Sequence, residues 1–126
     1  MKSTPFIKVT IDYGFGPEAI KEVKLKLIAL SYQTTDTLAV EAIDEDGESF
    51  ADITVCLGQP LMPGFAFIDT NNCRWAEEML RKNGIAKPAA NGACMASGFC
   101  TYPLYQFDMS KFSEEFHYPG EEEERP

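Results

Sequence analysis

Four segments in the first half of the chain predict strands, and in the first two of them apolar and polar residues alternate as they do in strands that bury one face. The four segments are Phe6–Ile11, Glu22–Leu30, Thr37–Ile43 and Ser49–Leu57. The last three follow one another closely, and the acidic Asp-Gly turn at Asp44–Glu48 is typical of a hairpin, so they should form an antiparallel meander. Tyr13–Pro17 is a turn-rich break whose aromatic side chains we expect to pack on the core.

The middle of the chain predicts a buried strand followed by an amphipathic helix. Phe65–Ile68 is a short apolar run, which favours a strand buried on both faces. One helical face then collects the apolar side chains of Trp75, Ala76, Met79 and Leu80. Gly84 is well placed to end the helix, and the polar corner Asp69–Asn72 offers side chains that could cap its first amides.

After the helix the residues become small and then aromatic. Ala86–Gly98 consists mainly of Ala, Gly and other small residues, and we expect a long loop there. Phe99–Phe107 is rich in aromatic residues and predicts a strand, in which Pro103 implies an edge position or an irregular start. Ser110–Phe116 should form one or two helical turns, with Phe112 and Phe116 facing inward.

These elements predict an α+β fold. We expect an antiparallel sheet of about five or six strands with one main helix packed on one face. Residues 1–118 should form a single domain, since a chain of 126 residues is long enough for one core and too short for two. The tail, residues 119–126, should be disordered because its glutamates repel one another and nothing apolar anchors it.

Composition narrows the function classes. Eleven basic against twenty acidic residues give a net charge of −9, which argues against direct nucleic-acid binding. The N-terminus lacks the apolar core of a signal peptide, and no stretch reaches the length of a membrane span, so we expect a cytoplasmic protein with no membrane association. Its cysteines should therefore be reduced.

The cysteines and the single histidine do not form a recognisable site. Cys56, Cys73, Cys94 and Cys100 contain no close pair of the kind that binds structural zinc, and we expect neither a metal nor a cofactor. His117 lies beside the tail, a poor place for a catalytic base. Cys73 would lie in the first helical turn, where a thiolate is favoured, but a small residue buried against the sheet is the preferred interpretation.

Two motifs carry a resemblance to a known family. AFIDTNNC-WAEE at Ala66–Glu78 and SGFCTYPLYQF at Ser97–Phe107 resemble a family of small bacterial proteins that is known only as a domain of unknown function. The resemblance covers the second half of the chain, and the first half matches only in its strand pattern and in the YGFG and KEVKLKL segments. It implies an association with gut anaerobes and their conjugative elements, and it supplies no catalytic residues.

Three functions stay open at this stage. The leading hypothesis is a non-enzymatic cytoplasmic interaction or accessory protein with a protein partner, which the resemblance extends to service of a mobile genetic element. The alternatives are a small thiol-dependent enzyme or ligand-binding protein with a site near Cys73 or Cys100, and an acidic mimic of DNA. The oligomeric state is left open. The candidate binding surface consists of Asp69, Thr70, Asn71, Asn72, Cys73, Ser97, Cys100 and Tyr102.

Overall fold

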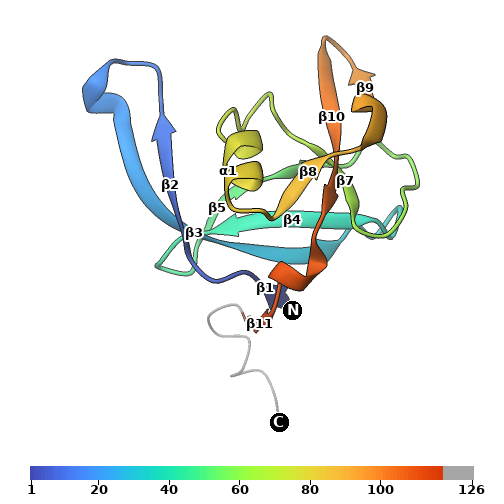
Figure 1. Ribbon diagram of the computed structural model, residues 1–126, viewed down its shortest axis with the longest axis horizontal. Helices are drawn as coiled ribbons and strands as arrows, with labels where there is room; N and C mark the ends of the chain where they lie inside the picture. The colour runs from blue at the N-terminus through green and yellow to red at the C-terminus, as the bar shows by residue number, and fades with distance from the viewer. Residues whose placement is uncertain (118–126) are drawn as a thin grey trace.

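The computed structural model describes residues 1–117, which form two antiparallel sheets and one α-helix (Figure 1). The six strands of the first sheet are β1 (Lys2–Ser3), β2 (Ile7–Asp12), β3 (Ile20–Ser31), β4 (Leu38–Ile43), β5 (Ser49–Asp52) and β11 (Glu114–Glu115). The five strands of the second are β6 (Thr54–Val55), β7 (Phe65–Ile68), β8 (Ala86–Pro88), β9 (Cys94–Ser97) and β10 (Cys100–Phe107). The helix is α1 (Ala76–Lys82), and short 3-10 turns occupy η1 (Pro17–Ala19), η2 (Ala90–Gly92) and η3 (Met109–Lys111).

The α+β class, the antiparallel pairing and the one main helix are confirmed. The meander β3–β4–β5 is present, and its Asp-Gly turn is held by Asp44, whose Oδ1 accepts bonds from the amides of Asp46 (2.9 Å) and Glu48 (3.0 Å). The strands nevertheless form two sheets instead of one. In the first sheet the order is β11-β1-β3-β4-β5 with β2 also paired to β3, and in the second it is β6-β7-β10-β8 with β9 also paired to β10.

The division into two sheets occurs inside the strand expected at Ser49–Leu57. That segment changes sheets at Ile53, which is fully buried. The Ile53 amide donates to the carbonyl of Val40 in β4 (2.9 Å), while its carbonyl accepts from the amide of Asp69 just after β7 (2.9 Å). Thr54 strengthens the crossing, because its Oγ1 accepts from the Val40 amide (3.0 Å) and bonds the Tyr32 hydroxyl (2.8 Å). One short segment therefore holds both sheets together.

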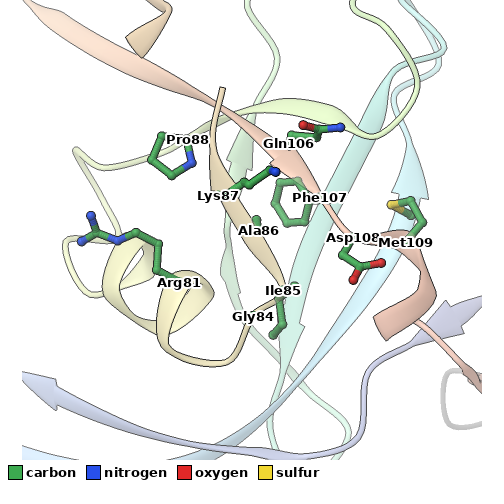
Figure 2. Close-up of a pocket in the computed structure, with 10 residues that line it drawn as sticks. All are labelled: Arg81, Gly84, Ile85, Ala86, Lys87, Pro88, Gln106, Phe107, Asp108 and Met109. Atoms are coloured by element: carbon green, nitrogen blue, oxygen red, sulfur yellow. The ribbon is translucent and has the colours of Figure 1, made fainter. Parts of the chain in front are cut away.

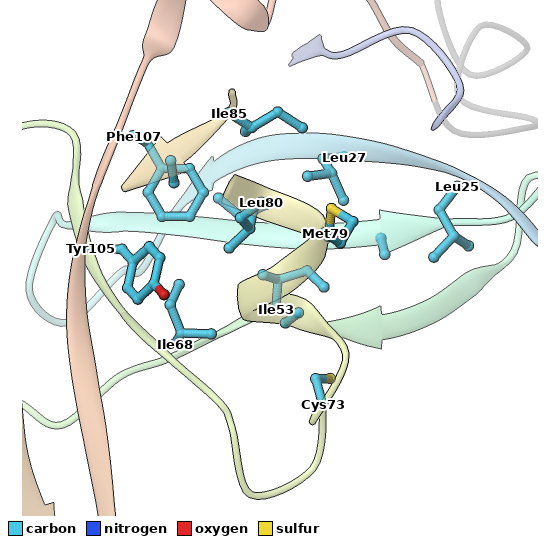
Figure 3. Close-up of a cluster of buried hydrophobic side chains, with 14 of the residues drawn as sticks. Leu25, Leu27, Ile53, Ile68, Cys73, Met79, Leu80, Ile85, Tyr105 and Phe107 are labelled. Atoms are coloured by element: carbon cyan, nitrogen blue, oxygen red, sulfur yellow. The ribbon is translucent and has the colours of Figure 1, made fainter. Parts of the chain in front are cut away.

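The core lies between the first sheet, the second sheet and α1 (Figure 3). The first sheet contributes Leu25 and Leu27, the helix contributes Met79 and Leu80, and Tyr105 lies on β10 in the second sheet. The Tyr105 ring is fully buried, and its hydroxyl donates to Glu77 Oε1 on α1 (2.7 Å). Burial and this carboxylate together raise the pKa of Tyr105 to about 12, so the phenol remains a donor at neutral pH.

Strands β2 and β3 form a two-stranded arm that projects from the body (Figure 1, upper left). Along the arm, Ile7–Asp12 pairs with Ile20–Leu25, whereas β4 pairs with β3 only from Lys26 onward. The arm tip, residues 13–19 between the two strands, therefore extends beyond the sheet and its core. Phe15 is 86% exposed and Tyr13 is 50% exposed, so the expectation that these aromatic side chains pack on the core was wrong.

The end of the described chain differs in part from expectation. Instead of one or two helical turns across Ser110–Phe116, η3 is a single short turn and the following β11 pairs with β1. Phe112 is buried against Phe107, as expected for an inward-facing residue. The prediction of a disordered acidic tail at 119–126 lies outside the described residues.

The crossing at Ile53 and Thr54 generates a stability prediction. In Thr54→Val the Val40 amide, which is buried, loses its acceptor, and an unsatisfied buried donor costs about 2 kcal/mol. Urea unfolding should therefore show a clear loss of stability for Thr54→Val. Thr10→Val, the same change at an exposed position of β2, serves as the control and should leave the unfolding midpoint unchanged. Equal midpoints for Thr54→Val and the parent protein would contradict the role assigned to this residue.

Candidate functional site

The β9–β10 hairpin brings three of the predicted surface residues together. Ser97 in β9 is the register partner of Cys100 in β10, and Tyr102 pairs with Met95. The thiol of Cys100 beside it is the main cause that raises the pKa of Tyr102, and the charge of Asp69 raises it further. The antiparallel register pairs Leu104 with Phe67, so the Asp69 corner, which directly follows β7, lies at the same end of this pairing as Tyr102.

The segment expected as a long loop at Ala86–Gly98 is instead the edge of the second sheet. Strand β8 pairs with Tyr105–Phe107 and strand β9 pairs with Cys100–Pro103, both along β10. Small residues such as Ala and Gly have low strand propensity, so the sequence does not predict a strand here. Their backbone N–H and C=O groups can nevertheless bond to a neighbouring strand. The edge position inferred from Pro103 applies to only part of β10, because β7 pairs with β10 at Leu104–Gln106 while Pro103 has a register partner only in β9.

Strand β9 presents an open edge to solvent. The carbonyl of Ala93 accepts a bond from the amide of Leu104 in β10 (2.9 Å). Because successive strand residues point their backbone groups to opposite sides, the N–H and C=O groups of Cys94 and Ala96 face away from β10. No second strand pairs with β9 within residues 1–117. The hairpin turns at Phe99, which is fully exposed.

The polar corner Asp69–Asn72 folds on itself and does not cap the helix. Asp69 Oδ1 accepts from the Asn72 amide (3.3 Å), Oδ2 accepts from Asn72 Nδ2 (2.9 Å), and the Asp69 carbonyl accepts from the Cys73 amide (2.8 Å). Helix α1 begins later, at Ala76, and its N-terminal flanking residue Trp75 makes no side-chain capping bond. The expected cap was therefore wrong, since local turn bonds compete successfully for the same side chains.

The members of this corner differ in exposure. Asn71 and Asn72 are exposed, Thr70 is half-buried and Asp69 is almost buried. The exposed members can therefore contribute to a surface that also includes the hairpin.

Cys73 does not share the exposed surface. It precedes α1 and is buried, and its Sγ contacts the carbonyl of Asp52 (3.3 Å; Figure 3). Burial raises the pKa of the Cys73 thiol to about 11, with smaller contributions from the charges of Asp69 and Asp52. The expected position in the first helical turn was wrong, and the small buried residue is the interpretation that the geometry supports. A buried protonated thiol is a poor nucleophile.

A cavity beside the sheet crossing, lined by both apolar and polar residues, was missed by sequence reasoning. Its volume is about 440 Å³, and Tyr32, Asp52, Thr54, Cys56 and Asp69 are among the residues that line it. The backbone amide of Gly58 lowers the pKa of Cys56, and the hydroxyl of Thr35 lowers it further. No spacing in the sequence indicates that Tyr32 meets Thr54 across the fold.

Within residues 1–117, no three His, Cys, Asp or Glu side chains are grouped in a way that could hold a metal ion. In the same part of the chain, no helix combines the length and the apolar character that crossing a membrane requires.

Comparison with known proteins gives one match. A family model described as "Domain of unknown function (DUF4313)" matches residues 25–123. No curated protein and no solved structure matches the chain. The family match begins inside β3 and so leaves β1, β2 and the arm tip outside it, although Val9 and Ile11 of β2 are buried in the core. The folded unit is therefore longer at its N-terminal side than the matched segment.

The burial of Cys73 generates a labelling prediction. At pH 8 its thiolate fraction should be about 100-fold below that of an ordinary thiol, because its pKa is raised from 9.0 to about 11. Iodoacetamide should therefore modify exposed Cys94 well before Cys73, and the Cys73 rate should keep rising up to about pH 11. Mass spectrometry of timed samples measures both rates. Urea-unfolded protein is the control, in which the difference should vanish, and equal rates in the folded protein would contradict the assignment.

Proposed function

The chain belongs to the DUF4313 family of domains of unknown function, and from that premise we propose that it is a protein-interaction module with no catalytic activity of its own. Its binding surface is the β9–β10 hairpin together with the adjoining polar corner. The corner contributes Asp69, Thr70, Asn71 and Asn72, and the hairpin contributes Ser97, Cys100 and Tyr102.

The single observation that carries this proposal is the open, uncharged edge of β9. Edge strands are commonly protected by charged side chains or proline, because free backbone groups pair with other chains. Residues 88–107 contain no charged residue, although the whole chain carries a net charge of −9. Cys94 and Ala96 leave four backbone groups directed at solvent, and a partner segment in extended conformation would satisfy them by adding a strand.

Phe99 supplies the apolar contact that such an interface needs. It is fully exposed at the end of the hairpin, directly beyond β9. Large aromatic side chains contribute much of the binding energy at protein interfaces, whereas an aromatic ring left in water contributes little to folding. The partner chemistry that fits is therefore an extended, largely uncharged segment with an apolar pocket beside it.

We also propose a cytoplasmic setting and an accessory role for this module. All four cysteines are free thiols and Cys94 is exposed, which suits a reducing compartment. The association with a mobile genetic element rests on the sequence resemblance alone.

The proposal predicts which substitutions abolish capture of a partner. Ala96→Pro removes an outward-facing N–H without removing a bond to β10, so the fold should persist while strand addition fails. Phe99→Ser should weaken capture roughly tenfold, because a central aromatic anchor contributes about 1.4 kcal/mol or more. Affinity capture from a lysate of the source organism, quantified by mass spectrometry, measures both effects.

Phe15→Ser is the matched control, since it removes a similarly exposed phenylalanine from the arm tip. The specific partner is the protein that the parent chain and Phe15→Ser both retain and Ala96→Pro loses. Unchanged recovery of every captured protein with Ala96→Pro, in a variant whose circular dichroism matches the parent, would overturn the proposal.

A further inference from the structure

A groove separate from the hairpin surface lies beside the C-terminal end of α1 (Figure 2). Its volume is about 570 Å³, within the range of roughly 300–1,000 Å³ that is usual for small-molecule sites. Ile85 and Phe107 are almost completely buried at its base, whereas Pro88 and Met109 present exposed apolar surface. The groove therefore offers apolar contact to a ligand of modest size.

Two cations line the same groove. Arg81 comes from α1 and Lys87 from β8, and in Figure 2 Lys87 lies between Arg81 and Met109, with the Arg81 guanidinium pointing away from it. Lys87 shares its exposed face of the sheet with its register partner Gln106. Within residues 1–117, neither cation forms a salt bridge, whereas Lys2, Lys8 and Lys26 are each paired with a glutamate. An anion at the groove would therefore not have to displace an existing ion pair from Lys87.

The one acidic side chain of the groove is already engaged. Asp108 Oδ1 accepts bonds from the amide (3.1 Å) and the hydroxyl (2.6 Å) of Ser110, and these bonds lower the pKa of Asp108. Asp108 is thus a fixed negative charge beside Met109, at the side of the groove away from Arg81. It repels a ligand anion from that side and favours an orientation with the anion at Lys87.

We propose that this groove binds a small amphipathic carboxylate, with the carboxylate at Lys87 and the apolar chain extending toward the exposed Met109. The charge pattern selects an anion at one side, and the apolar lining selects an aliphatic or aromatic body of the ligand. This site goes beyond the interaction surface of the hairpin and does not depend on it.

Decanoate is the probe that tests the proposal, and decanol, which has the same chain without the charge, is its neutral counterpart. Titration of the full chain, followed by amide NMR shifts below the micelle concentration, should give saturable changes at Ala86, Lys87, Gln106 and Asp108. Decanol should bind at least about fivefold more weakly, because it lacks the charge that pairs with Lys87.

Two substitutions distinguish decanoate binding at this groove from a general effect of net charge on binding. Lys87→Glu should weaken decanoate binding by about fivefold, since an attraction is replaced by a repulsion. Lys82→Glu changes the net charge equally, also near the end of α1, but Lys82 lies outside the groove, so binding should change less than about twofold.

Several results would overturn the proposal. One is the absence of saturable shifts, and another is a pattern of shifts centred on Phe15 or Phe99 instead of the groove. Equal weakening by Lys82→Glu and Lys87→Glu would show a general effect of charge without a site. Decanol binding as tightly as decanoate would likewise contradict the role of Lys87.

Discussion

The crossing of one chain segment from the first sheet to the second at Ile53 holds this fold together. The two backbone bonds of Ile53 point in opposite directions, to β4 in one sheet and to the residue after β7 in the other. The hydroxyl of Thr54 satisfies a buried amide at the same place and ties in Tyr32. Because each sheet buries its apolar face against the other, the position of the β9–β10 hairpin relative to the first sheet depends on this crossing.

The second sheet is built around β10. That strand pairs with β7 on one side and with β8 and β9 on the other, while Tyr105 anchors it to α1 through Glu77. The buried half of β10 is thus fixed by core packing, and its other half extends into the hairpin that carries Phe99. The packed half of β10 supports the exposed, uncharged edge of β9. This edge can therefore present its backbone groups to a partner while losing little conformational entropy on binding.

Sequence patterns predicted the elements whose side chains decide their structure, and missed those decided by the backbone or by distant contacts. The apolar run Phe65–Ile68 is a buried strand, and the helix buries Ala76, Met79 and Leu80 as its spacing indicated, because local propensity and burial favour the same structure there. The edge strand β9 is instead made mostly of small residues, whose apolar and polar positions do not alternate. It is a strand because it pairs with β10. For the candidate surface, the hairpin residues and the corner were named from sequence, whereas the burial of Cys73 depends on the sheet crossing.

Hydrogen–deuterium exchange tests the central claim most directly, once the captured partner is purified. The amides of Cys94 and Ala96 face solvent in the free protein and should exchange rapidly, whereas a strand added at β9 would bond them and slow their exchange by several orders of magnitude. We predict that the complex protects these amides together with residues near Phe99. Protection confined to the arm tip or to the first sheet, with Cys94 and Ala96 exchanging as fast as before, would contradict the account.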